Sequence, residues 1–176
     1  MQPLFRIFEI EEEEVQRLAA MPDEPHDHDF EELIIGMEGQ LEHFIDYKTN
    51  TYEAPLLVFV TKGKVHRLIP RLKDGKCRLW VIRFKSEFIP ETTFQLYSYY
   101  HDHANIPMQP GACFNRMVTL CEMMHGEMQQ EVPDLSVIRH LLSALFAMME
   151  SERIKHAPDD AGIHKTQNST FKNFLK

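Results

Sequence analysis

The chain has 176 residues, and 43% of them are hydrophobic, which supports one domain with a real core and excludes a mainly disordered chain. The balance of 19 Lys and Arg against 27 Asp and Glu gives a net charge of −8, which argues against nucleic-acid binding through the general surface. No apolar run reaches the ~18–20 residues that span a bilayer, and the three cysteines lack a CxxC pair. We therefore expect a cytoplasmic protein without a membrane partner.

The chain up to about residue 106 has the pattern of closely spaced β-strands. Runs rich in Ile, Val, Phe, Leu and Tyr predict strands over residues 4–10, 30–37, 40–47, 56–61, 65–69 and 79–84. Glu38-Gly39 predicts a hairpin and Asp74-Gly75 a second tight turn, while the glutamates at 11–14 are interpreted as a solvated stretch. Because strands do not alternate with helices, the pattern predicts an antiparallel sandwich or small barrel.

Two helices are predicted after the change in composition near Pro107. The first carries apolar residues at spacings of three and four, namely Phe114, Met117, Cys121, Met124 and Met128. The second repeats that spacing with Leu135, Ile138, Leu142, Leu145 and Met149. Val132-Pro133-Asp134 divides them, and so short a link predicts an antiparallel pair.

The second helix is apolar over a wide arc, because Leu141, Met148 and Ile154 lie outside its main stripe. We predict that one face covers the barrel or the partner helix and that another joins a second copy of the chain. The residues assigned to this homodimer interface are Leu135, Ile138, Leu142, Leu145 and Met149. The alternative is that both stripes are buried core.

The predicted organisation has three parts: a barrel over 1–106, a helical hairpin over 107–156, and a final segment over 157–176. The final segment begins as a polar linker, and Ser169 then caps a short helix with Phe171 and Phe174 on one face. Because a helix of about two turns is not stable alone, we expect the chain to be the front part of something longer.

The segment Pro25-His26-Asp27-His28-Asp29-Phe30-Glu31-Glu32 carries the most chemistry. Side chains alternate along a strand, so His26, His28 and Glu32 share one face, and His66 is available from another strand. Two or three imidazoles and a carboxylate are a ligand set suited to Zn, Fe, Mn, Ni or Cu. The alternatives are a hydrogen-bonded polar cluster without metal and a pocket for a small effector.

These residues resemble the cupin motifs. His26, His28, Glu32 and Gly39 are similar to the first motif, and Gly63-Lys64-Val65-His66 is similar to the core of the second. The resemblance implies a small jelly-roll β-barrel, in whose metalloenzyme members the four equivalents of the three histidines and the glutamate bind a metal. The second motif departs from the family at Thr61 and Pro70, where Pro and Asn are usual, and Pro55 replaces its leading Gly.

A wider pattern comprises residues 26–35, Gly39 with 44–47, 56–66, and 83–89. This pattern covers nearly the whole chain and resembles the N-terminal domain of AraC-type transcription regulators. The resemblance implies a cupin-like barrel that binds a small effector, followed by a helix pair that dimerises. In that family a linker then leads to a DNA-binding domain with two helix-turn-helix motifs. No such motif lies in these residues, so DNA would be a partner only through that further domain.

Two more pocket residues follow from strand alternation. His43 is predicted to point inward from the apolar face of Leu41 and Ile45, and Trp80 to lie on the inner face with Ile82. We therefore expect effector contacts from His26, His28, Glu32, His43, His66 and Trp80. Trp80 could stack on a sugar or aromatic ligand, although core filling is an equal alternative.

Three functions follow from these observations. The first is the effector-binding and dimerisation domain of an AraC-like regulator, with a sugar, an organic acid or an aromatic as ligand. The second is a metal-dependent cupin enzyme, such as a dioxygenase or isomerase, and the third is a binding module without regulation. No nucleophile elbow, phosphate-binding glycine loop or catalytic carboxylate pair is visible, so no enzymatic activity is predicted from this segment.

Overall fold

The computed structural model describes residues 3–22, 24–90 and 98–155, so the sequence-based prediction for 157–176 lies outside the described residues. Its strands are β1 (Phe5–Ile10), β2 (Glu31–Glu38), β3 (Gln40–Ile45), β4 (Lys48–Glu53), β5 (Leu56–Val60), β6 (His66–Arg71), β7 (Arg78–Phe84) and β8 (Asn105–Pro107). Its helices are α1 (Glu12–Ala20), the short 3₁₀ helix η1 (Ser86–Phe88), α3 (Ala112–Met128) and α4 (Leu135–Lys155).

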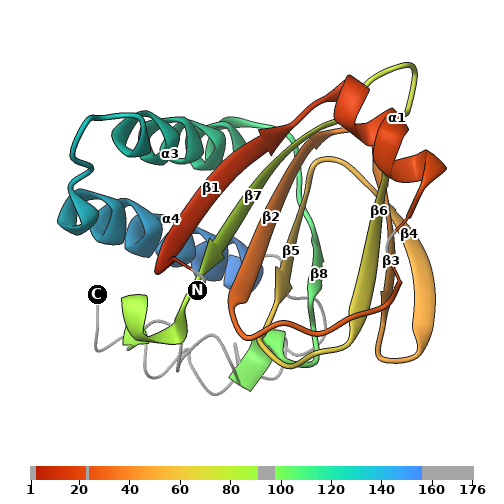
Figure 1. The fold of residues 1–176 in the computed structure, drawn as a ribbon, viewed down its shortest axis with the longest axis horizontal. Helices are drawn as coiled ribbons and strands as arrows, with labels where there is room; N and C mark the ends of the chain where they lie inside the picture. Colours follow the sequence, from red (N-terminus) through yellow and green to blue (C-terminus); the bar gives the residue numbers. More distant parts are fainter. Residues whose placement is uncertain (1–2, 23, 91–97, 156–176) are drawn as a thin grey trace.

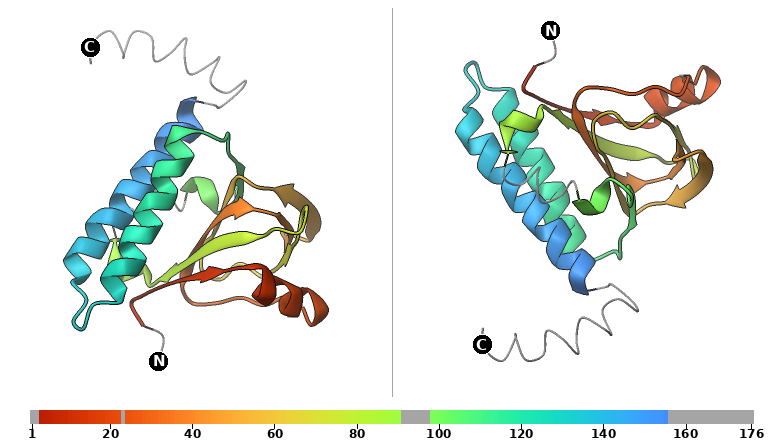
Figure 2. Two further views of the ribbon diagram at one scale, coloured as in Figure 1. Left: turned by 90° about the horizontal axis from the view of Figure 1, so that it is seen from above. Right: turned by 90° about the horizontal axis from the view of Figure 1, so that it is seen from below.

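The strands form two sheets that face each other, with orders β1-β7-β2-β5-β8 and β4-β3-β6 (Figure 1). All pairings are antiparallel. The helices α3 and α4 follow the strands and run antiparallel along the outer face of the five-stranded sheet (Figures 1 and 2). The predicted class, antiparallel β-structure followed by a helix pair, is therefore confirmed. No helix within the described ranges is long and apolar enough to cross a bilayer.

The five-stranded sheet is buried on both faces, which explains the continuous apolar run of β5. Leu57 and Phe59 join the core under the helices, whereas Leu56 and Val58 join the core between the sheets. The same alternation corrects the prediction for Trp80. Its side chain packs against the helix pair, with its ring 5.3 Å from that of His125, and so lies outside the space between the sheets.

The apolar stripe of α4 belongs to the core of the same chain. Ile138 and Leu142 are fully buried against the sheet and α3, as are Leu145 and Met149, while Leu135 packs partly buried beside them. The predicted dimer interface is therefore corrected for four of its five residues, because Ile138, Leu142, Leu145 and Met149 have no exposed surface to offer a second chain. The alternative of buried core holds for this stripe.

Gly39 marks a crossing between sheets and not the predicted hairpin, because β2 and β3 pair with different partners. A side chain at Gly39, where φ is 101°, would put its Cβ 2.7 Å from the sulfur of Cys77. The hairpin lies one strand later, between β3 and β4, where Asp46 and Tyr47 both have positive φ as a type I′ turn requires. The turn predicted at Asp74-Gly75 is present.

The glutamates at 11–14 are mostly the start of a helix. Glu12, Glu13 and Glu14 occupy the first turn of α1, where negative charge favours the helix dipole. Val15 buries its side chain completely beneath them. The interpretation of this run as a solvated stretch therefore holds for the exposed carboxylates, but from Glu12 onward the backbone is helical.

Candidate metal and ligand site

Three predicted ligands meet between the two sheets. Glu32 points inward from β2, His66 begins β6 in the opposite sheet, and His28 lies in the segment that precedes β2. One ligand atom from each lies within 4.8 Å of the other two. The Nε2 atoms of the histidines are 3.2 Å apart, and each is 3.7 Å from Oε1 of Glu32.

His26 takes a different position from the one predicted. Its side chain is exposed, and its Nδ1 lies 2.9 Å from the carbonyl oxygen of Glu24. Its backbone instead pairs with His66 in both directions, at 2.9 and 2.8 Å, and so holds the preceding segment against β6. Among the described residues the ligand cluster therefore contains three members, and His26 supports it through the main chain.

Hydrogen bonds fix which imidazole nitrogens carry a hydrogen. His28 Nδ1 lies 2.8 Å from the carbonyl oxygen of Phe30, which can only accept, so Nδ1 carries a hydrogen, and in the neutral tautomer Nε2 then presents its lone pair. His43 Nδ1 likewise donates to Oδ1 of Asn105 at 2.8 Å. His43 Nε2 must then accept from Nδ1 of His66 at 3.1 Å, which leaves a lone pair on Nε2 of His66.

The result is a cluster of acceptors without a hydrogen between them. Two imidazole lone pairs and one carboxylate oxygen converge, and burial lowers the pKa of His66 to about 3, which keeps that ring neutral. Burial also lowers the pKa of His43. Acceptors in this arrangement repel one another unless a cation lies among them, and two imidazoles with one carboxylate match the facial triad of divalent metals.

Glu32 is held in its ionised form. Burial by itself raises the pKa of this carboxyl, but the charge and the hydrogen bond of the Arg83 guanidinium act against burial and lower the pKa. Arg83 donates from Nε to Oε2 at 2.7 Å, so the other oxygen, Oε1, remains directed at the histidines. The carboxylate is thus oriented as a metal ligand requires.

Two supporting residues were missed by the sequence-based prediction. Asn105 comes from β8 and Arg83 from β7, and both reach the cluster through pairings far apart in the sequence. Arg83 shares its strand face with Leu79 and Val81, so a correct assignment of that face would have indicated it. Nothing in the sequence around Asn105 distinguishes it from a loop asparagine. His43, in contrast, was predicted to point inward, and its complete burial confirms this.

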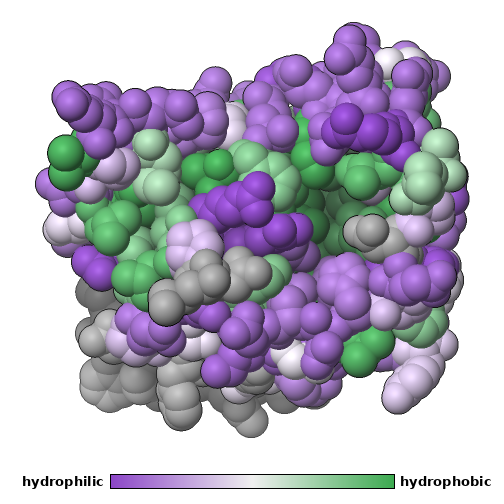
Figure 3. All heavy atoms as spheres, viewed as in Figure 1, coloured by the Kyte–Doolittle hydropathy of each residue, from purple (hydrophilic) through white to green (hydrophobic). Residues whose placement is uncertain are grey.

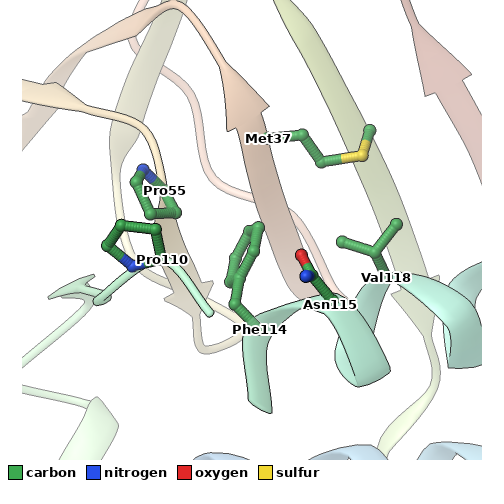
Figure 4. A pocket seen from close by; sticks show the side chains of 6 residues that line it. All are labelled: Met37, Pro55, Pro110, Phe114, Asn115 and Val118. Carbon is green, nitrogen blue, oxygen red and sulfur yellow. The ribbon is translucent and has the colours of Figure 1, made fainter. Parts of the chain in front are cut away.

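The surroundings offer room for a ligand. A cavity of about 890 Å³ opens beside His28 and is lined also by Phe30, Lys62 and Lys85. Figure 3 shows a hollow between the sheets with hydrophobic side chains inside it. A smaller apolar cavity of about 340 Å³ lies apart from the histidines, where Phe114 of α3 approaches Met37 of β2 (Figure 4).

Comparison with solved structures finds one match that supports the fold and weaker ones beside it. The apo structure of ToxT K231A from Vibrio cholerae matches with a TM-score of 0.55 and 11% identity over 85% of this chain and 57% of that chain. The AraC-like transcriptional activator CuxR matches with a TM-score of 0.47 and 11% identity, over 81% and 48% of the two chains. A cupin-2 protein from Shewanella frigidimarina shares 25% identity at a TM-score of 0.31, over 44% and 66%.

The match to ToxT agrees with the fold described above. The chain has a cupin-like antiparallel β-structure with C-terminal helices. It spans about half the length of the ToxT and CuxR chains it matches. No protein-family model and no curated protein matches the sequence.

Proposed function

We propose that this chain is the ligand-sensing domain of an AraC-like transcription regulator. A small molecule would enter the hollow between the sheets and bind beside His28, Glu32 and His66. The observation that carries the proposal is the polar cluster that points inward between the two sheets. The helix pair covers the other face of the five-stranded sheet. The net charge of −8 fits a domain that leaves DNA contacts to another part of a longer protein.

A divalent metal at the cluster is part of the proposal. His28 and His66 would supply imidazole nitrogen and Glu32 a carboxylate oxygen, with His43 and Asn105 holding the His66 ring in the required tautomer. Zn, Fe, Mn and Ni all accept such ligands. When bound, the metal would supply a positive centre that attracts and orients an anionic or hydroxylated ligand.

A metal-dependent enzyme is the second candidate, and the triad favours it. Three protein ligands leave coordination positions open, as in metal sites where substrate binds directly. A dioxygenase or isomerase would use those positions for catalysis, whereas a sensor would use them to hold its effector. The sensor and the enzyme would bind their ligand through the same residues, and only the enzyme would convert it into a product.

Two measurements on the full chain separate these functions. Titration of Zn²⁺ into chelator-treated protein, followed by calorimetry, should give one site that Glu32→Gln abolishes. Glu42→Gln in β3, whose carboxylate pairs with Arg71, should leave the site intact. Thermal unfolding in a panel of sugars and organic acids should then reveal a stabilising ligand that is recovered unchanged. Consumption of that ligand would support the enzyme instead, and a panel without any stabilising compound would count against a sensor.

Dimerisation remains part of the proposal, with a different surface from the predicted one. The outer sides of α3 and α4 carry exposed apolar residues, among them Met123, Val137 and Ile154. Light scattering after size exclusion should give twice the chain mass, and Ile154→Lys should reduce it to that of one chain. A monomer at every concentration would remove dimerisation from the account.

A further inference from the structure

Two arginines face each other on the inner side of the five-stranded sheet. Arg6 of β1 lies directly opposite Arg83 of β7, and Arg83 lies opposite Glu32 of β2. The three residues form one row at the rim of the face that lines the hollow. Like charges directly opposite each other on neighbouring strands destabilise a sheet, and Arg6 has an arginine, not a carboxylate, opposite it.

Most N–H groups of the two guanidinium groups have no hydrogen-bond acceptor among the described residues. Arg83 binds Glu32 through Nε alone, and its terminal amino groups meet no acceptor among the described residues. Within the same described ranges the side chain of Arg6 forms neither an ion pair nor a hydrogen bond. The row therefore holds one negative carboxylate and two positive guanidinium groups. A metal at the cluster would increase this excess of positive charge.

Aromatic rings hold both guanidinium groups in place. The guanidinium carbons of Arg6 and Arg83 lie 4.7 and 5.3 Å from the ring centre of Phe8, and that of Arg83 lies 5.2 Å from the ring centre of Phe30. Figure 3 shows strongly hydrophilic side chains gathered over β1 and β7, beside the hollow with its hydrophobic lining. Positive charge and apolar surface thus adjoin at the entrance.

We propose that Arg6 and Arg83 bind the carboxylate of the ligand, which makes the ligand a small organic acid. The planar guanidinium matches a carboxylate with two parallel hydrogen bonds, and Arg83 already binds one carboxylate, Glu32, in this position. The apolar body of the acid contacts Phe8 and Phe30 and extends toward the histidines. This inference rests on the proposed sensing function and names the class of its ligand.

Calorimetry with benzoate as the probe tests the assignment on the full chain. Benzamide is its neutral match, and inorganic phosphate tests whether any anion suffices. We expect benzoate to bind at one site and benzamide at least about tenfold more weakly. Arg6→Met should weaken benzoate by about tenfold or more, because Arg6 is exposed and its loss leaves the core intact. Arg17→Met, which removes an exposed arginine that pairs with Glu14 on α1, should leave the affinity unchanged.

Each contrary result has a distinct meaning. Equal binding of benzoate and benzamide, or benzoate binding that ignores Arg6→Met, would overturn the arginine assignment but leave a sensor that recognises its ligand in another way. Tighter binding of phosphate than of benzoate would also overturn it, since the rings predict an organic body. If neither these probes nor the sugars and acids of the thermal panel bind, both this inference and the proposed sensing function fail.

Discussion

His66 is the residue on which the polar cluster depends, because each of its ring nitrogens has a separate task. Nδ1 donates to His43, and Nε2 is directed at His28 and Glu32. The sequence predicted the types of these residues from a short histidine-rich motif and a distant Gly-x-x-His. The role of Asn105 was not predicted. This residue lies in β8 and accepts the first hydrogen bond of the chain, from His43, and the contact forms only when the two sheets come together.

Removal of Asn105 should therefore weaken metal binding without removing a ligand. Asn105→Ala frees the His43 ring to change tautomer, and loss of such a supporting hydrogen bond typically reduces metal affinity by about 10- to 100-fold. Calorimetric titration with Zn²⁺ measures the change, and Asn115→Ala on the surface of α3 serves as the control. Equal affinities for both variants would show that the tautomer chain has no bearing on the site.

Acid should destabilise the metal-free protein through His66. The ordinary pKa of 6.5 applies in the unfolded chain, and the folded value is about 3, so unfolding takes up a proton between these values. The free energy of unfolding should accordingly be unaffected above pH 6.5 and fall by about 1.4 kcal/mol per pH unit as pH decreases below it. Below pH 4.5 Glu32, whose folded pKa is about 2, adds a loss of the same sign.

Urea unfolding of chelator-treated protein at several pH values measures this slope. His66→Gln removes the titrating ring and should flatten the profile between pH 6.5 and 4.5, apart from the smaller contribution of His43. A wild-type profile that is already flat in this interval would mean that His66 is protonated in the folded protein.

At the scale of elements, the helix α4 shows what periodicity can and cannot indicate. Its spacing correctly placed Ile138, Leu142 and Leu145 on one face, but it could not tell a face that covers the chain's own sheet from one that meets a partner. The strand β7 presents the same ambiguity. Both of its faces are buried, so alternation alone could not decide whether Trp80 or Val81 lines the hollow.

Two substitutions in α4 distinguish core from surface. Leu142→Ala removes a fully buried side chain and should lower the free energy of unfolding by about 2–5 kcal/mol. Val137→Ala, at a residue 40% exposed, should cost less than about 1 kcal/mol. Chemical denaturation gives both values. If Leu142→Ala proves nearly neutral at low protein concentration, the stripe does not belong to the core of the single chain.

The end of α4 is tied to the segment before β8 by one buried hydroxyl. Tyr100 donates to the carboxylate of Glu150 at 2.8 Å, and Arg153 binds the same carboxylate. Because hydrogen bonds to charged groups contribute about 1.5–3 kcal/mol, Tyr100→Phe should destabilise the protein by roughly that amount. Tyr47→Phe, at an almost fully exposed ring, is the matched control and should have no effect. The prediction fails if the two variants unfold alike.

For the whole molecule, the order of parts was predictable and the assignment of strands to sheets was not. Strand composition and two amphipathic helices indicated antiparallel β-structure followed by a helix pair. The strand β4, Lys48–Glu53, escaped notice because its polar side chains are mostly exposed and carry no apolar alternation. The false hairpin at Gly39 has a similar origin, since a glycine turn looks the same whether the chain pairs with itself or crosses to another sheet.

The central claim is that three acceptors converge between the sheets without a hydrogen among them. Nitrogen-15 NMR of the imidazole side chains, recorded on the metal-free full chain at neutral pH, tests it most directly, because protonated and unprotonated ring nitrogens resonate far apart. We predict hydrogen on Nδ1 and a lone pair on Nε2 for His28, His43 and His66, with the Nε2 signals of His28 and His66 shifting when Zn²⁺ is added. A hydrogen on Nε2 of His66, unchanged by metal, would contradict the account.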